Sequence, residues 1–209
     1  MREFQEFERN ELIEELIDYI ESELPKFVSS QTFSKIMVVK KNETQHSTAF
    51  VLFMLKNQNK FSFIPEVAQV GTHKIDVAVY DKLSDEMLFT IEAKILPTLP
   101  GTKKKPRAES EYVYSNLGES GAGIQRFRLG YHGVNDEQIQ LPENGMLAYI
   151  KCEDFNFWLA KVNQWILDAK WDQSEQLEKI HFNSIGKLKS KHPTANGSKM
   201  ILHHFWVKV

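Results

Sequence analysis

Apolar and polar residues alternate most regularly between positions 73 and 95. Two apolar runs, 75–80 and 88–95, have the period-two pattern of β-strands, and the polar residues 82–86 between them supply turn chemistry. This stretch predicts a β-hairpin, around which the other predicted elements are arranged.

The two faces of the predicted hairpin differ in character, because side chains alternate between the faces of a strand. One face is wholly apolar and carries Ile75, Val77, Val79, Phe89, Ile91, Ala93 and Ile95. The other face carries Asp76, Ala78, Tyr80, Leu88, Thr90, Glu92 and Lys94. Folding about Ser84 places Asp76 opposite Glu92, and like charges directly opposite each other destabilise a sheet. A divalent cation is the simplest candidate that would favour the pair.

An Asp on one strand followed by Glu-x-Lys on the next resembles the PD-(D/E)xK nuclease superfamily, which has the restriction-endonuclease-like fold. The matching residues are Asp76 and Glu92-Ala93-Lys94, and Ile75 stands where the family usually has proline. The resemblance implies that Asp76, Glu92 and the backbone carbonyl of Ala93 bind Mg²⁺, with Mn²⁺ as a substitute. It also implies that Lys94 orients the attacking water or stabilises the developing negative charge.

The order of the other elements is that of the resembled core. The pattern predicts a helix over 42–59, a strand over 61–69, a short helix over 124–130, a buried strand over 145–151 and a helix over 155–169. With the hairpin, residues 41–170 give helix, antiparallel meander, loop, helix, strand and helix. We therefore expect a single α/β domain, 1–209, whose mixed central sheet is flanked by helices.

Two further elements lie outside this core. Apolar residues at helical spacing predict an acidic N-terminal helix within 1–28 that ends at Pro25, and that covers the domain's own core or contacts another subunit. Residues 177–209 predict a C-terminal β-hairpin with strands over 177–191 and 199–209, because Asn196-Gly197 is a turn signal.

Three more residues are candidates for the site. In the resembled family, the helix before the sheet often carries a Glu near the metal, and Glu43 matches it, although acids favour a first helical turn in any case. The helix after the Glu-x-Lys strand often presents a Gln, Arg or Lys, and Gln125 matches that place. Glu66 would face Asp76 across the first two strands as a further metal ligand, unless a bulge at Pro65 turns it away.

Basic residues after the Glu-x-Lys strand suggest contacts with phosphate. The candidates are Lys103, Lys104, Lys105, Arg107, Arg126 and Arg128. Tyr112 and Tyr114, in the predicted loop over 96–119, are candidates for base stacking. A solvated loop is the alternative interpretation, since loops of this length are usually functional or disordered.

Charge and composition narrow the possible functions. The net charge is −2, but residues 1–28 carry nine acidic and three basic residues, so this segment has charge −6 and the remainder +4. A mildly basic body suits contact with phosphate. The single cysteine, Cys152, excludes an internal disulfide and suggests a reducing, cytoplasmic setting. We find no signal peptide, membrane span, P-loop or nucleophile-elbow motif.

The resemblance implies a Mg²⁺-dependent nuclease, most simply a DNA endonuclease, with a role in restriction or phage defence. Nucleic acid is the expected partner, and a homodimer or a separate specificity subunit is compatible with the sequence. Two alternatives remain. One is a catalytically silent nucleic-acid-binding or assembly module with the nuclease fold, and the other is a nuclease directed at RNA.

Overall fold

A computed structural model describes residues 2–31, 33–34, 43–57, 60–99, 101, 107–117 and 121–209, with the backbone alone for 2–8 and 57. A seven-stranded sheet forms its centre, with the strand order β1-β2-β3-β4-β7-β6-β5. The strands are β1 (Phe61–Ala68), β2 (Lys74–Asp81), β3 (Met87–Leu96), β4 (Glu143–Ile150), β5 (Glu178–Phe182), β6 (Gly186–Pro193) and β7 (Lys199–Lys208). β4 runs parallel to both of its neighbours and the other pairs are antiparallel, so the expected mixed α/β sheet is confirmed.

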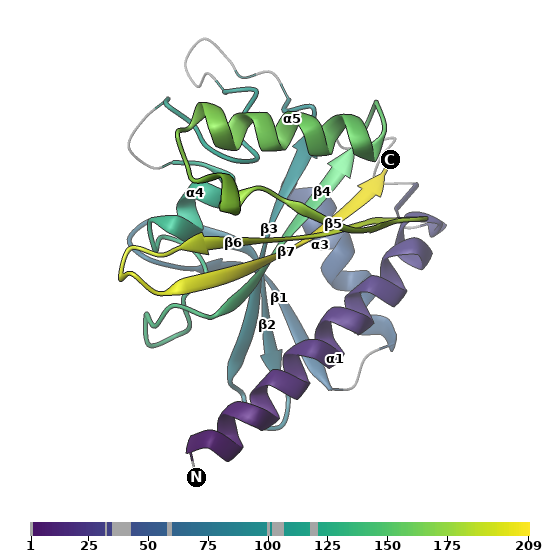
Figure 1. Cartoon of the computed structure of the whole chain (residues 1–209). Coiled ribbons are helices and arrows are strands. Elements are labelled where there is room, and N and C mark those ends of the chain that lie inside the picture. Colours follow the sequence, from purple (N-terminus) through teal and green to yellow (C-terminus); the bar gives the residue numbers. More distant parts are fainter. Residues whose placement is uncertain are drawn as a thin grey trace.

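Helices cover both faces of the sheet (Figure 1). The helical segments are α1 (Arg2–Val28), α3 (Glu43–Met54), η1 (Leu55–Asn57), α4 (Gly123–Arg128), α5 (Phe155–Asp168) and η2 (Gln173–Glu175). The apolar side chains of α1 and α3 pack in one core cluster, and those of α4 and α5 pack in a second. The N-terminal helix therefore covers the domain's own core.

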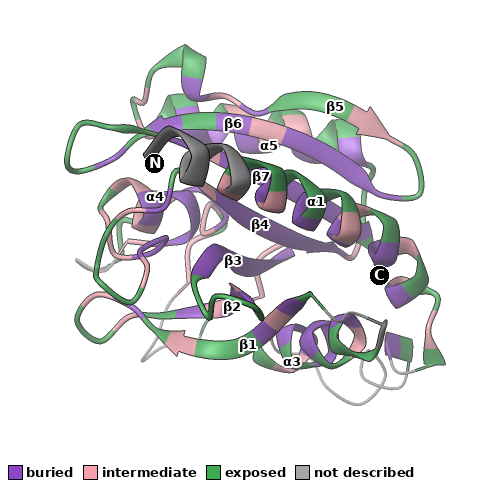
Figure 2. Ribbon diagram, turned by 90° about the horizontal axis from the view of Figure 1, so that it is seen from below, coloured by how far each residue is buried: buried purple, intermediate pink, exposed green. Residues whose placement is uncertain are grey.

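The middle of the sheet is buried on both faces. Every residue of β3 is buried, and β4 is buried at all positions after Glu143 (Figure 2). Strands in such positions are apolar almost throughout, which explains why the sequence of β3 is rich in Leu, Ile, Phe and Ala. Charged side chains on β3 must therefore have partners, because an unpaired buried charge is costly.

The N-terminal helix does not end at Pro25, as the sequence predicted, but continues to Val28. Phe27, two residues after this proline, is fully buried and packs edge-on against Phe33, with ring centroids 4.8 Å apart. Burying a phenylalanine contributes about 2–3 kcal/mol. This is comparable with the roughly 3 kcal/mol that an internal proline costs a helix.

The β2–β3 hairpin has the predicted register in its central part, where Val77 pairs with Ile91. The register then shifts near the turn, so that Leu88 becomes an extra residue and its side chain joins the cluster under α1 and α3 instead of the opposite face. Ile75 also differs from the prediction, because it packs in the cluster under α4 and α5 together with Val67, its partner on β1. The side chains on either side of Asp76 in β2, those of Ile75 and Val77, therefore pack on opposite faces of the sheet.

The predicted C-terminal hairpin is present as β6 and β7, but it is part of the central sheet. β7 lies between β4 and β6, and its residues pair with both strands along their length. The first predicted strand, 177–191, is divided into β5 and β6. His203 and His204 point to opposite faces of β7, as their adjacent positions in a strand require.

Six buried polar side chains form one chain of hydrogen bonds on the face covered by α4 and α5. The chain runs from Trp206 through Tyr112, His204, Ser190 and His192 to Glu175, with distances of 2.9, 2.7, 2.7, 2.8 and 2.9 Å. Its direction is fixed at both ends, because an indole N–H only donates and a carboxylate only accepts. Burial lowers the pKa of both histidines, so each is neutral and accepts one hydrogen bond while donating another.

This buried chain holds α4 at both of its ends. At the N-terminal end, the backbone N–H of Ile124 donates to the carbonyl of Tyr112 at 3.1 Å. At the C-terminal end, Arg128 lies 2.9 Å from Glu175 and its guanidinium lies 4.1 Å from the centre of the Trp171 ring. The position of α4 is therefore fixed by β6 and β7.

Candidate carboxylate site

The candidate site lies where β2 and β3 separate. The paired part of the hairpin ends at Val77 and Ile91, whereas β3 continues to Leu96. Beyond this point the backbone N–H of Ala93 donates to Oδ2 of Asp76 at 2.7 Å. The Asp76 side chain thus takes the place of a backbone carbonyl in the ladder, which brings its carboxylate against β3.

Glu92 and Lys94 form a buried ion pair next to Asp76. Their side chains are 2% and 8% exposed, and Nζ of Lys94 lies 2.6 Å from Oε1 of Glu92. The same ammonium donates to the carbonyl oxygen of Ala93 at 3.0 Å. Two other cationic or titratable groups approach Glu92, namely Nη1 of Arg126 at 3.4 Å and Nδ1 of His132 at 3.3 Å.

The side chain of Glu43, at the first position of α3, approaches Lys94 and the backbone of β3. Its Oε1 accepts hydrogen bonds from the backbone N–H of Ile95 at 3.4 Å and from Nη2 of Arg107 at 2.9 Å. Its Oε2 lies 3.8 Å from Nζ of Lys94. We refer to Asp76, Glu92, Lys94 and Glu43 as the carboxylate cluster.

The electrostatics of the cluster separate its two strand carboxylates. Burial, and then the charge of Glu92, raise the pKa of Asp76 to about 8. Burial also favours the neutral form of Glu92, but Lys94, His132 and Arg126 outweigh it and hold the pKa of Glu92 well below its usual range. The pKa of Lys94 is raised, because Glu92 and Glu43 more than offset the effect of burial. Without a cation, the two carboxylates are not both ionised at neutral pH.

The other predicted site residues have different positions. The Oε1 of Gln125 accepts from the backbone N–H of Ser115 at 3.2 Å, so this side chain binds the preceding loop. Arg128 is paired with Glu175, as described above. Glu66 is exposed, with a left-handed φ of 53°, and among the described residues no hydrogen bond or ion pair joins it to the cluster.

The residues predicted to contact phosphates and bases in the loop after β3 have different surroundings. Lys103, Lys104 and Lys105 lie outside the described residues. Arg107 is described, and it is shared between Glu43 and Glu111, with Nη2 2.5 Å from Oε2 of Glu111. Tyr112 is fully buried in the hydrogen-bond chain, so the prediction that it stacks on bases is wrong. Tyr114 is half-buried against the same core cluster.

Sequence reasoning missed His132, a fully buried side chain in contact with Glu92. It follows α4 in a turn bounded by Gly130 and Gly133, which have left-handed φ values of 72° and 78°. A side chain at position 133 would collide with Phe127, because its Cβ would lie 2.9 Å from Cδ1 of that ring. The two glycines mark this turn in the sequence, but they do not reveal what the histidine between them touches.

The donor set of the cluster fits a hard divalent cation. Asp76 and Glu92 offer carboxylate oxygens and Ala93 offers a carbonyl, and Mg²⁺ typically combines one or two carboxylates with water molecules. The raised pKa of Asp76 agrees with this, since a cation would relieve the repulsion between the two acids. Within the described part of the chain, no three His, Cys, Asp or Glu side chains are grouped as a complete metal site, so water would have to complete the shell.

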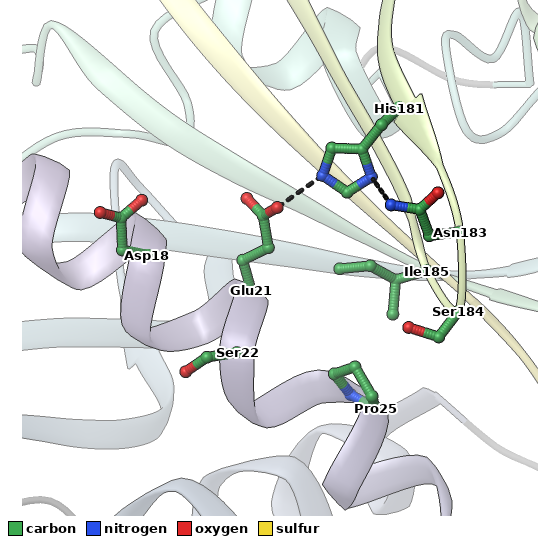
Figure 3. A pocket seen from close by; sticks show the side chains of 8 residues that line it. All are labelled: Asp18, Glu21, Ser22, Pro25, His181, Asn183, Ser184 and Ile185. Carbon is green, nitrogen blue, oxygen red and sulfur yellow. Dashed lines mark hydrogen bonds and ion pairs between the residues drawn. The ribbon is translucent and has the colours of Figure 1, made fainter.

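A separate pocket lies between α1 and the segment that joins β5 to β6 (Figure 3). Nε2 of His181 lies 2.5 Å from Oε1 of Glu21 at its rim, and Nδ1 of the same ring lies 3.4 Å from Nδ2 of Asn183. No residue of the carboxylate cluster lines this pocket.

Comparison of the chain with protein-family models, with curated proteins and with solved structures found no match. Among the described helices, none combines the length and the apolar character needed to cross a bilayer. The candidate function therefore rests on the geometry of the site itself.

Proposed function

We propose that this protein is a Mg²⁺-dependent nuclease with a restriction-endonuclease-like fold, which hydrolyses phosphodiester bonds in DNA. The observation that supports this most directly is the convergence of Asp76, Glu92 and Lys94 where β2 and β3 separate, with Glu43 beside them. A purely structural role would not require two acids of this kind next to each other on a buried strand pair.

The residues of the cluster divide the chemistry between them. Asp76, Glu92 and the carbonyl of Ala93 would hold the metal ion, which when bound lowers the pKa of a coordinated water and stabilises charge on the scissile phosphate. Lys94 already donates to Glu92 and to the carbonyl of Ala93. In this proposal its ammonium orients the attacking water or stabilises the negative charge that develops on phosphate oxygen. Glu43 keeps Lys94 charged and near the backbone of β3.

The order of elements supports the same proposal. An antiparallel meander of β1, β2 and β3 is followed by α4, by the parallel strand β4 and by α5, with α3 packed on the meander. DNA as the substrate, a cytoplasmic location, and a role in restriction or phage defence rest on the resemblance of Asp76 and Glu92-Ala93-Lys94 to the nuclease motif.

One observation favours a second candidate function, a catalytically silent nucleic-acid-binding or assembly module with the same fold. Both oxygens of Glu92 are already engaged, Oε1 by Lys94 and Arg126 and Oε2 by His132. A metal ion would have to displace at least one of these partners. If these partners cannot be displaced, the site retains its fold but does not cut.

Cleavage assays distinguish these candidates. Supercoiled plasmid, linear duplex DNA, single-stranded DNA and RNA are incubated with Mg²⁺ or Mn²⁺ and with wild type, Asp76→Asn, Lys94→Ala or the exposed-site control Lys56→Ala. We expect wild type and Lys56→Ala to cut DNA, and Lys94→Ala to be about 10²-fold slower or worse, because a charge-stabilising donor at a reacting centre is worth this much. Circular dichroism verifies that each variant is folded.

The preferred polymer identifies the substrate class, so cleavage of RNA alone would replace DNA in the proposal. If folded wild-type protein leaves every polymer intact with either metal, the nuclease proposal is refuted and the silent module is supported. Equal rates for Lys94→Ala and wild type would show that the cleavage arises elsewhere in the chain or in a contaminant.

A further inference from the structure

Two aromatic rings form a stacked pair beside the carboxylate cluster. His73, in the connection between β1 and β2, lies parallel to Tyr131, which follows α4, with ring centroids 4.6 Å apart and an interplanar angle of 9°. Both side chains are half-buried, so part of the pair faces solvent. The pair is linked to the site through His132, whose ring packs edge-on against His73 at 5.9 Å and reaches Glu92.

The two segments that carry the pair are fastened to each other. The side-chain amide of Gln69 donates to the carbonyl of Val134 and accepts from the N–H of the same residue, both at 3.1 Å. Gln69 is only 5% exposed, so these bonds are shielded from water. A second connection joins the hydroxyl of Tyr80 to Oδ1 of Asp136 at 3.2 Å. The two segments that carry the aromatic pair are therefore held together before any ligand binds, which reduces the entropic cost of binding.

The electrostatic surroundings of the pair suit a nucleotide. Burial lowers the pKa of His73, and the positive charge of Arg126 lowers it further, so the ring is neutral at neutral pH. Arg126 is 28% exposed and approaches Glu92 with Nη1, while its Nε donates to the carbonyl of Gly121. A neutral flat ring next to a partly exposed guanidinium is the combination that binds a base and its adjoining phosphate.

We propose that His73 and Tyr131 form a stacking site for an unpaired nucleobase, and that Arg126 contacts the phosphate next to that base. This inference rests on the proposed nuclease function, and it specifies the substrate as nucleic acid with an unstacked base near the scissile bond. A base pair inside an intact duplex keeps its faces covered by its neighbours. Single strands and frayed or distorted duplex ends expose a face that can stack on Tyr131 or His73.

A binding assay without metal, in which no cleavage occurs, tests the proposal. A fluorescein-labelled oligo(dT) 12-mer, a matched oligonucleotide in which the central residues are abasic, and a blunt duplex are titrated in EDTA with wild type, Tyr131→Leu, Tyr131→Phe and the control Phe157→Leu. Phe157 is an exposed aromatic residue on α5 and so matches the change at Tyr131. Fluorescence anisotropy gives Kd, and thermal unfolding verifies that each variant is folded.

We expect Tyr131→Leu to raise the Kd for oligo(dT) roughly tenfold, because one stacked base contributes about this factor or more. Tyr131→Phe and Phe157→Leu should bind like wild type, and the abasic oligonucleotide should bind wild type and Tyr131→Leu equally. Arg126→Met should weaken both oligonucleotides and reduce the salt slope by about 0.7. A loss of the same size for oligo(dT) and for the abasic strand would show a structural defect and overturn the inference.

The same assay separates this inference from the proposed function. If wild type binds oligo(dT) through Tyr131 but cuts no polymer, the nuclease proposal fails and the stacking site stands. If wild type cuts and Tyr131→Leu binds every probe normally, the stacking site fails and the nuclease proposal stands. If wild type binds none of the probes, the stacking site is refuted regardless of cleavage.

Discussion

Raising the pH should strengthen Mg²⁺ binding, because Asp76 must lose a proton before its carboxylate can hold a cation. Burial and the neighbouring charge of Glu92 raise the pKa of Asp76 to about 8. At pH 6 a group with this pKa is ionised in about one molecule in a hundred. We therefore expect the apparent Kd for Mg²⁺ to fall about tenfold per pH unit from pH 6 to 8, and to level off above about pH 9.

The same shift determines how the stability of the metal-free protein depends on pH. Since the pKa of Asp76 rises from 3.8 to about 8 on folding, the folded state keeps a proton that the unfolded state releases. This group favours folding most below about pH 4, and its contribution is lost as the pH rises through 8. Asp76→Asn cannot ionise, so it should gain stability relative to wild type between pH 6 and 8, by at most about 1.4 kcal/mol per unit.

Isothermal titration calorimetry with Mg²⁺ at pH 6, 7, 8 and 9 measures the first effect, and urea unfolding in EDTA at the same pH values measures the second. The matched control is Asp85→Asn, at an exposed turn position between β2 and β3. A Kd that is constant from pH 6 to 9 would refute the reasoning about Asp76. So would unfolding free energies of the two variants that differ from wild type by the same amount at every pH.

Two further predictions concern the parts that hold α4. Ser190→Ala should destabilise the fold by about 2–6 kcal/mol, because it leaves one buried imidazole N–H and one buried imidazole acceptor unpaired. The control Ser198→Ala, at an exposed position, should cost little. Urea midpoints at unchanged m-values measure both variants, and equal midpoints would contradict the role of the buried hydrogen-bond chain. Gly123→Ala should cost about 2–5 kcal/mol, because its Cβ would lie 2.0 Å from the carbonyl oxygen of Tyr112. Gly197→Ala meets only backbone strain and should cost about 1–2 kcal/mol, so a larger loss for Gly197→Ala in the same unfolding assay would refute the packing argument.

The core of the site could be predicted because it depends on local pattern. Strict alternation and a short polar connection define one hairpin register, and that register places Asp76 against the backbone next to Glu92. The position of Lys94 on the same face of β3 as Glu92 follows from the same alternation. The placement of Glu43 at the start of α3 required the order of elements as well, and the structure brings it within 3.8 Å of Lys94.

The rest of the site depends on tertiary contacts that leave little trace in the local sequence. His132 and Tyr131 belong to a turn whose position is fixed by Gln69, more than sixty residues earlier in the chain. Tyr112 lies in a polar loop in the sequence, but its hydroxyl accepts from Trp206 and donates to His204, and these two hydrogen bonds with β7 make it part of the core. Patterns of polarity along the chain cannot distinguish a tyrosine that binds a ligand from one that binds a histidine ninety-two residues away.

Local rules also fail where tertiary packing outweighs them. Pro25 is a sound signal for the end of a helix, and Phe27 overrides it by filling the core. Leu88 follows the alternation of its strand in the sequence, but the register shift turns it to the other face. In both cases the apolar side chain finds a better-buried position than the local rule allows, at the cost of one irregularity in the backbone.

The position of β7 has a consequence for how this domain is made on the ribosome. β7, which completes the middle of the sheet, is synthesised after the other six strands of that sheet. More than fifty residues separate each residue of β4 from its partner on β7, the strand that covers the open edge of β4. Until residues 199–208 leave the exit tunnel, the nascent chain exposes the unpaired backbone of β4 and β6, which invites pairing with other chains. A premature stop shortly before Lys199 would therefore yield two half-sheets prone to aggregation, even though every residue of the carboxylate cluster had already been translated.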